Sequence, residues 1–278
     1  MKKLWIVTEL FYPEETSTAF ILTKIANALS DKFDVNVICG PESYGRAALE
    51  DNPSTKLSLD GRIKIHRVSN CNLNKDKIFT RLLRFLIIGF KLSFSLWKNA
   101  KKQDRVFIVT NPAPLLISVA LIKRIKKFPL YILVHDVFPE NTIPAGVISS
   151  DKTFGYKLLR KCFNWAYKSA DCLIVLGRDM RQIMKSKLGK NQNNTKIEII
   201  ENWAENDIAQ LNPVNKSKNI VIQYAGNIGR VQGLKSFIQQ YAEAMNPIVS
   251  LELWGDGAMR KELEEYACLL YTSPSPRD

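Results

Sequence analysis

Short apolar runs rich in β-branched residues alternate with helical patterns along this chain, and this alternation restricts its fold more than any other feature. The expected strands are the runs at residues 3–9, 34–40, 62–68, 105–112, 129–137, 171–177, 195–203, 219–226 and 249–255. The expected helices are at residues 18–33, 78–97, 115–127, 152–169, 234–244 and 259–266. Strands that are joined through helices predict βα units and an α/β fold, with a parallel sheet covered by helices.

A polar segment at residues 205–218 interrupts the alternation and predicts a linker between two α/β domains. We therefore expect one domain at residues 1–204 and the start of a second at residues 219–267. The second has room for only two βα units, which is too few for a stable doubly wound sheet. The last residues, 268–278, change character abruptly, and we interpret them as a non-native tail on a chain truncated near Ala267.

The chain is strongly basic, with 40 Lys and Arg against 27 Asp and Glu and a net charge of +13. Its 46% of apolar and 24% of charged residues are typical of globular proteins and exclude a disordered, collagen-like or disulfide-scaffold chain. A basic protein attracts nucleic acid, an anionic membrane or phosphorylated small molecules. The basic residues are not interleaved with aromatic residues on a recognisable module, so we expect no nucleic-acid partner.

The pattern of cysteines and the N-terminal residues both predict a cytoplasmic protein. The five cysteines are odd in number, scattered and without a C-x-x-C pair, which argues against a zinc site and a secreted disulfide framework. Only LWIV is apolar before Thr8 and Glu9, so we expect no secretory signal peptide.

A basic helix is expected at residues 78–102. Arg81, Arg84 and Lys91 interrupt its apolar stretch, so we do not expect it to span a membrane. Two interpretations remain. It is a surface helix that packs its apolar side on the sheet, or it lies in the headgroup layer of an anionic membrane, held by aromatic and basic side chains.

The segment YAGNIGRVQGLKSFI at residues 224–238 is the strongest candidate for a binding site. Its three glycines lie between an expected strand and an expected helix, where they allow the backbone to approach a ligand closely. Amides at a helix N-terminus attract phosphate oxygens, and Arg230 adds donors suited to phosphate. The segment lacks the signatures of a P-loop and of a dinucleotide-binding turn. By itself it also fits a plain structural turn.

Three further segments carry candidate residues. A Gly-Asp-Gly turn at residues 255–257 precedes the last expected helix, which Asp256 could cap. His135, followed by Asp136, lies at the carboxyl end of an apolar strand, where ligands of open α/β sheets gather. Polar residues 14–18 follow the first strand and could face the same cleft. The other histidine, His66, is interpreted as structural.

The order of five motifs along the chain resembles a known family, the GT-B glycosyltransferases of family 4. In the first domain they are LSDKFDVNVIC at residues 29–39, His-Asp with Pro-Glu at residues 135–140, and IENW at residues 200–203. In the second domain, G-N-hydrophobic-G-x-x-Q-G matches residues 226–233, and G-D-G-x-x-R matches residues 255–260. The resemblance covers the chain from Trp5 to about Ala267.

The resemblance implies two Rossmann-like domains facing a cleft, with the second incomplete, and retaining transfer of a sugar from a nucleotide-sugar donor. The donor, a UDP-sugar, would bind the second domain without a cofactor or a required metal. The acceptor, a lipid-linked glycan for surface polysaccharide, would bind the first domain at the inner face of the cell membrane. The implied catalytic residues are His135 and Asp136. The implied donor-binding residues are Gly226, Asn227, Gly229, Arg230, Gln232, Gly233, Gly255, Asp256 and Gly257, with Lys235 near the diphosphate. Glu14, Glu15, Thr16, Ser17 and Glu140 would line the cleft.

The chain departs from the family pattern at two points. It has Asn227 and Gln232 where many members have Arg and Lys, a variant similar to a subgroup that builds surface polysaccharides. The family's paired glutamates, with seven residues between them, would lie beyond residue 267, so we expect the 278-residue chain not to turn over. Two alternatives remain, namely a non-catalytic GT-B-like membrane-associated scaffold and a nucleotide-sugar epimerase of GT-B fold.

Overall fold

A computed structural model describes most of the chain and divides it into two compact units. The described residues are 1–14, 16–42, 58–69, 78–144, 146–189, 195–203, 220–244 and 246–272. The first unit consists of Met1–Asn141 and Ser150–Trp203, and the second of Thr142–Ser149 and Ala204–Asp278. The predicted linker at residues 205–218 and the end of the predicted tail, at residues 273–278, lie outside the described residues.

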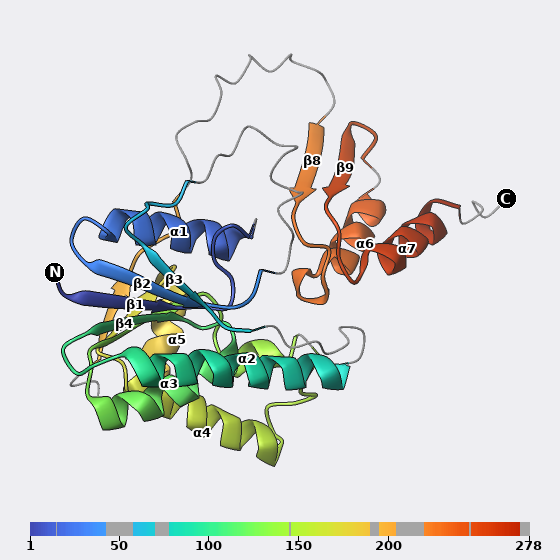
Figure 1. The fold of residues 1–278 in the computed structure, drawn as a ribbon. Coiled ribbons are helices and arrows are strands. Elements are labelled where there is room, and N and C mark those ends of the chain that lie inside the picture. The colour runs from blue at the N-terminus through green and yellow to red at the C-terminus, as the bar shows by residue number, and fades with distance from the viewer. Residues whose placement is uncertain are drawn as a thin grey trace, which may run out of the picture. The chain divides into compact units, whose positions relative to one another are not determined.

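The first unit is built on a parallel sheet whose seven described strands follow the order β3-β2-β1-β4-β5-β6-β7 (Figure 1). The strands are β1 Lys3–Val7, β2 Asp34–Cys39, β3 Lys64–Arg67, β4 Arg105–Val109, β5 Leu130–Val134, β6 Cys172–Val175 and β7 Lys196–Ile199. The helices are α1 Ser17–Leu29, α2 Ile78–Asn99, α3 Ala113–Lys126, α4 Phe154–Lys168 and α5 Arg178–Leu188, with a short 3₁₀ helix η2 at Glu140–Thr142. The predicted parallel sheet with covering helices is confirmed.

Alternate residues of each strand enter different cores, as the period of two in a β-strand requires. On β1, Leu4 and Ile6 pack in the core that also contains Leu22 of α1. Trp5 and Val7 pack in the core formed with α2, α3, α4 and α5. Figure 1 shows α1 on one face of the sheet and α2, α3 and α4 on the other.

Local sequence signals fix where two of the helices begin. Thr16 caps α1 because its Oγ1 accepts a hydrogen bond from the Ala19 amide at 3.2 Å. Thr153 caps α4 in the same way, at 3.3 Å from the Tyr156 amide. Within the described parts of the chain, no helix combines the length and the apolar character needed to cross a bilayer.

The second unit contains strands β8 Ile220–Ala225 and β9 Val249–Trp254, which pair in parallel, with helices α6 Leu234–Ala244 and α7 Arg260–Thr272. A 3₁₀ helix, η3 Arg230–Gln232, precedes α6. Its small core consists of Ile228, Leu234, Ile238 and Leu263. These are the two βα units predicted from the sequence, except that α7 continues beyond Tyr266 to Thr272.

Candidate functional site

The carboxyl edge of the first unit's sheet gathers the candidate residues of that unit. Strands β1, β4 and β5 are parallel neighbours, so their carboxyl ends meet at one edge. The chain leaves β1 toward β2 on one side, whereas β4 and β5 continue the sheet on the other. The edge beside β1 and β4 is therefore a topological switch point, where open α/β sheets bind ligands.

His135 is held at this edge by the end of the neighbouring strand. Thr110, which follows β4 directly, is fully buried. Its Oγ1 accepts hydrogen bonds from the backbone amides of His135, at 3.1 Å, and Asp136, at 3.0 Å. One hydroxyl therefore fixes the backbone direction of both predicted catalytic residues as the chain leaves β5.

The His135 imidazole is half-buried, and its Nε2 atom is buried without a hydrogen-bond partner among the described residues. Burial lowers the pKa of His135 below its ordinary value of 6.5, against the opposing effect of the Asp136 carboxylate. The lowered pKa favours the neutral ring at pH 7, and the hydrogen-bonding capacity of Nε2 is not used within the described residues. Asp136 itself is exposed.

The predicted cleft loop follows β1 at the same edge. The Glu14 side chain is buried, and its backbone amide donates to the Phe11 carbonyl oxygen at 3.1 Å. Thr16 and Ser17 form the beginning of α1. Glu15 lies outside the described residues. The structure therefore gives Thr16 a capping role and leaves the ligand contacts of the loop as a prediction.

Glu140, the last predicted residue of this edge, forms an ion pair with a buried lysine. The Lys187 Nζ atom of α5 lies 2.6 Å from Glu140 Oε2 and also donates to the Phe138 carbonyl oxygen at 2.9 Å. Arg160 lies farther from the same carboxylate, at 3.8 Å. The contacts of Glu140 indicate that it positions the loop after His135.

The two glycine-containing turns of the second unit lie side by side. The Gly226 amide donates to the Trp254 carbonyl oxygen at 2.9 Å, and the Ile228 amide to the Asp256 carbonyl oxygen at 2.8 Å. A Cβ atom on Gly255 would lie 1.9 Å from the Gly226 carbonyl oxygen, and one on Gly257 would lie 2.3 Å from that of Ile228. Only glycine permits backbones to approach this closely.

The first of these turns continues through η3 into α6. Gly233 ends η3 with a φ of 66°, a left-handed conformation that favours glycine. The side chains of Asn227 and Gln232 lie over Gly229, since a Cβ atom there would be 2.8 Å from Asn227 Nδ2 and 2.6 Å from Gln232 Oε1. These two amide side chains therefore pack against the backbone of the turn at Gly229.

The two cations of this turn differ in their surroundings. Arg230 is exposed, and no carboxylate in the described part of the chain pairs with it. Lys235, by contrast, pairs with Glu262 of α7 at 3.2 Å and lies 4.9 Å from the centre of the Tyr266 ring. Arg230 is thus available to an anion, whereas Lys235 joins α6 to α7.

Asp256 stabilises the turn that leads into α7. Its Oδ1 accepts a hydrogen bond from the Gly257 amide at 2.8 Å and lies 4.0 Å from Arg260 Nη1. The capping that the sequence predicted therefore acts on the turn before the helix, since α7 begins at Arg260.

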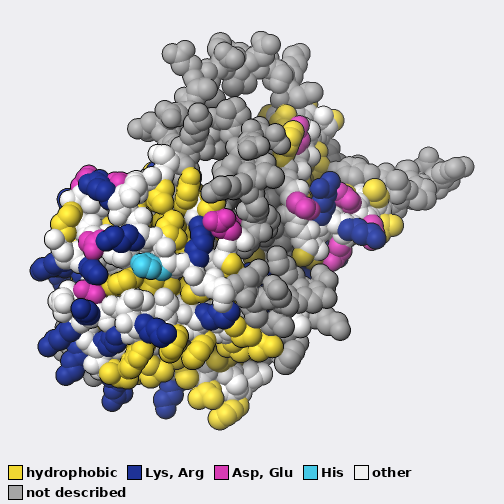
Figure 2. Space-filling model, viewed as in Figure 1, with side chains coloured by type: hydrophobic (Ala, Val, Ile, Leu, Met, Phe, Trp, Pro, Cys, Tyr) yellow, Lys and Arg dark blue, Asp and Glu magenta, His cyan; other side chains and the backbone are white. Residues whose placement is uncertain are grey.

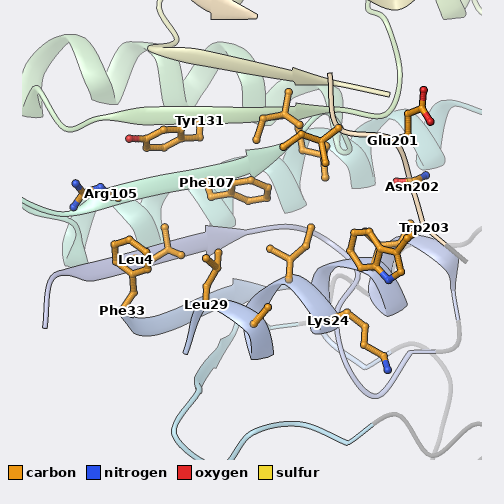
Figure 3. A pocket seen from close by; sticks show the side chains of 16 residues that line it. Leu4, Lys24, Leu29, Phe33, Arg105, Phe107, Tyr131, Glu201, Asn202 and Trp203 are labelled. Carbon is orange, nitrogen blue, oxygen red and sulfur yellow. The ribbon is translucent and has the colours of Figure 1, made fainter. Parts of the chain in front are cut away.

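A large apolar pocket lies elsewhere, on the sheet face beside α1. It measures about 600 Å³, and Leu29, Phe33, Phe107, Tyr131 and Trp203 are among the side chains around it (Figure 3). No predicted site residue lines it, apart from Ile200–Trp203 of the IENW motif. Lys24, Arg105, Glu201 and Asn202 are also among its lining residues, but the surface that the pocket presents is almost entirely apolar, which does not favour a diphosphate.

Three residues of the carboxyl edge were missed by the sequence reasoning. Thr110 and Lys187 hold the backbone around His135, and Glu9 follows β1, where its carboxylate lies 3.5 Å from Arg84 Nη2 of α2. Burial raises the pKa of Glu9, against the opposing effect of Arg84. Glu9 ends the run at residues 3–9 that was expected to form the first strand, and this position at the end of an apolar run was the signal that could have identified it.

Three features together define the GT-B fold class. They are the parallel sheet of the first unit, the βα units of the second unit, and the glycine turns that follow β8 and β9. Solved structures share this fold. The apo form of the lipopolysaccharide outer core galactosyltransferase WaaB aligns with a TM-score of 0.57 and 14% identity, over 98% of this chain and 65% of that one. Anabaena HepE in complex with UDP-glucose aligns with a TM-score of 0.59 and 18% identity, over 99% of this chain and 67% of that one.

Sequence comparison adds the family. Residues 21–207 match Glycosyltransferase Family 4, and the chain belongs to that family. It is 32% identical to the probable glycosyltransferase WbjE of Pseudomonas aeruginosa, over 96% of this chain. The chain spans 66% of the length of that relative. The predicted family and fold class are thereby confirmed.

Proposed function

We propose that the whole protein is a retaining glycosyltransferase of surface polysaccharide or lipopolysaccharide synthesis. It transfers a hexose or N-acetylhexosamine from a nucleotide-sugar donor, a UDP-sugar, to a lipid-linked glycan at the inner face of the cell membrane. The reaction needs no metal and no further cofactor. In this proposal the second unit binds the donor and the first unit binds the acceptor.

The pair of glycine turns in the second unit carries this proposal. The backbones of the two turns approach each other closely at Gly226 and Gly255, and the exposed Arg230 belongs to the first of these turns. Backbone amides and a guanidinium are the donors that bind diphosphate oxygens. The arrangement therefore suits the pyrophosphate group of a nucleotide-sugar.

The chemistry of sugar transfer gives these groups a role in the reaction. When the bond between the sugar and the diphosphate breaks, negative charge develops on the departing oxygen and must be stabilised. Arg230 and the amides of residues 229–233 supply that stabilisation in our proposal. Neutral His135, with its free Nε2 atom, contacts the donor sugar or its phosphate.

Similar proteins support the choice of donor and acceptor. HepE has been solved in complex with UDP-glucose, which supports a uridine donor. WaaB is described as a lipopolysaccharide galactosyltransferase, which supports a hexose and a glycan of the cell surface. The Asn227 and Gln232 variant of the glycine motif agrees with the same class of product.

Ligand-induced stabilisation of the 278-residue chain tests donor binding. We expect UDP-glucose or UDP-N-acetylglucosamine to raise the melting temperature more than GDP-mannose or dTDP-glucose does, since a ligand bound only by the folded state stabilises it. Arg230→Gln should weaken binding by about tenfold or more, the value of a charge-assisted hydrogen bond. Lys235→Gln is the matched control, because Glu262 already holds that lysine. Equal losses in both variants would contradict the role of Arg230.

Turnover by the whole protein tests the reaction itself. With a lipid-linked glycan acceptor, we expect UDP release, a product that retains the anomeric configuration of the donor, and an undiminished rate in EDTA. UDP release without any acceptor would favour the epimerase. Absence of nucleotide-sugar binding together with intact membrane binding would favour the scaffold.

A further inference from the structure

Helix α2 exposes a stripe of large apolar side chains on its solvent side. The stripe consists of Leu83, Leu86, Phe90, Phe94 and Trp97, which are 37–69% exposed. Their spacing of three or four residues places them on one face of the helix, while Ile88, Leu92 and Leu96 on the opposite face are fully buried in the core. Helix α2 is therefore apolar on two sides, and only one of them packs on the sheet.

The neighbouring helices continue this apolar surface. Helix α2 packs beside α3, and α3 beside α4, as Figure 1 also shows. On α3, Leu121 and Ile125 are 52% and 66% exposed. On α4, Phe154 and Leu158 are 83% and 53% exposed. We call the stripe of α2 with these two pairs the outer helix face.

Basic residues outnumber acidic ones on the segments that form the outer helix face. Residues 78–127 contain eleven Lys and Arg and a single acidic residue, Asp104, whose buried carboxylate accepts a hydrogen bond from Trp5. Residues 154–168 of α4 contain four basic and no acidic residues. Figure 2 shows hydrophobic and basic side chains together over the region of α2 and α3, at the bottom of the view.

The lysines lie beside the aromatic rings rather than apart from them. Lys98 Nζ lies 4.7 Å from the centre of the Phe94 ring, and Lys126 Nζ lies 5.3 Å from that of Trp97. An apolar body with a cation at its border matches the boundary between acyl chains and anionic headgroups. A second copy of the same basic face would instead repel this one.

We propose that the outer helix face docks on an anionic bilayer, with α2 lying in the plane of the membrane and Phe90, Phe94 and Trp97 inserted below the headgroups. This inference names the surface that brings the proposed enzyme to its lipid-linked acceptor, and it rests on the proposed function only for the identity of that acceptor. It assigns three helices, and not α2 alone, to the membrane contact.

The same helix reaches the candidate site. Arg84, on the N-terminal half of α2, lies 3.5 Å from Glu9 at the carboxyl edge of the sheet. Docking through α2 therefore brings the carboxyl edge that contains His135 close to the headgroup layer, where the diphosphate of a lipid-linked glycan lies. The docking surface and the acceptor side of the proposed site are joined by one rigid element.

Vesicle sedimentation of the 278-residue chain tests the proposal. We expect binding to vesicles of phosphatidylglycerol mixed with phosphatidylcholine, weaker binding to phosphatidylcholine alone, and a loss with added salt. The double variant Phe90→Ser with Phe94→Ser should bind at least about tenfold more weakly, because two phenylalanine side chains no longer leave water. Leu269→Ser is the matched control, since Leu269 of α7 in the second unit is 70% exposed. It should bind like the unchanged chain.

Depth-dependent quenching identifies the face that enters the bilayer. Lipids brominated on their acyl chains should quench tryptophan fluorescence in the unchanged chain, and Trp97→Phe should remove most of that quenching while binding persists. Quenching that survives Trp97→Phe would show that another face inserts and would overturn the proposal. A changed sedimentation coefficient of the Phe90→Ser, Phe94→Ser variant without vesicles, together with unaltered vesicle binding, would also overturn it in favour of self-association.

The vesicle experiments and the donor-binding experiment test separate claims, so their outcomes can be told apart. A chain that binds UDP-sugar but not vesicles contradicts only the docking surface. A chain that binds vesicles through the outer helix face but no nucleotide-sugar contradicts only the proposed function.

Discussion

The Nζ atom of Lys187 lies 2.6 Å from the Glu140 carboxylate and joins α5 to the loop that follows His135. The lysine is 2% exposed and also donates to the Phe138 carbonyl oxygen and to Asn164 Oδ1. Burial lowers the pKa of Lys187, although the Glu140 carboxylate opposes this effect. The charge is therefore kept in the protein interior by three oxygen ligands, two of which belong to the loop.

Removing one partner of this pair should destabilise the first unit. Lys187→Met leaves the Glu140 carboxylate and the Phe138 carbonyl without their cation, and we expect the free energy of unfolding to fall by about 2–4 kcal/mol, since Glu140 is partly solvated. Chemical denaturation measures the change. Lys185→Met, an exposed lysine of the same helix, is the control and should change stability little. Equal effects of the two substitutions would show that the ion pair is unimportant.

The hydroxyl of Thr110 should matter more than its methyl group. Thr110→Val preserves the shape of the side chain but leaves the amides of His135 and Asp136 without their acceptor, which should cost about 2–3 kcal/mol. Thr110→Ser keeps the acceptor and should cost less, about 1 kcal/mol. Denaturation of both variants, with the chemical shifts of His135 as a local probe, checks the order. Greater damage from serine would contradict the proposed role of the hydroxyl.

The fold was largely predictable because its strands are short apolar runs with clear borders. Each expected strand was found. Strands β1, β2, β4 and β5 are almost entirely buried and read as continuous apolar runs, whereas β7 and β9 show the alternation of a half-buried strand. Helix α5 was missed because Arg178–Leu188 is rich in charge, and only Met184, Lys187 and Leu188 of it are buried. The helix is nevertheless amphipathic, so its helical periodicity was a signal that a search for apolar runs does not detect.

The candidate site was only partly predictable for a related reason. Strand ends and glycine turns identify His135 and residues 226–233, because these positions are constrained locally. Thr110 and Lys187 act through partners 26 and 49 residues away in the chain. No local sequence pattern predicts such a contact. Lys187 also belongs to α5, the helix that the sequence analysis did not predict.

Protonation of His135 should make the first unit less stable in mild acid. Because burial lowers its pKa below 6.5, the unfolded chain binds a proton at a pH where the folded chain does not, so stability rises with pH in that range. The contribution is fully present above about pH 6.5 and is lost as the pH falls toward the folded-state pKa.

Denaturation across this pH range provides the measurement. His135→Gln should lack this component, so its stability relative to the unchanged chain should increase as the pH falls below about 6.5. In Asp136→Asn the opposing carboxylate is absent, and the loss of stability should extend to lower pH than in the unchanged chain. A constant difference between His135→Gln and the unchanged chain at every pH would contradict the lowered pKa.

Two glycine-to-alanine substitutions should have opposite effects because of what their new methyl groups meet. In Gly255→Ala the Cβ atom would lie 1.9 Å from the Gly226 carbonyl oxygen, a backbone atom that moves only if the two turns separate. We expect a loss of about 3 kcal/mol or more, since an overpacked contact combines with an unfavourable positive φ. Faster amide hydrogen exchange in β8 and β9, together with weaker UDP-glucose binding, would show this loss of stability.

Gly155→Ala in α4 is the control. Its Cβ atom has no neighbour within 4 Å, so it should be neutral or stabilise the helix by about 0.5–1 kcal/mol. Unaltered exchange and unaltered binding in Gly255→Ala would mean that the two turns need not approach each other closely, which would remove the geometric basis of the proposed diphosphate site.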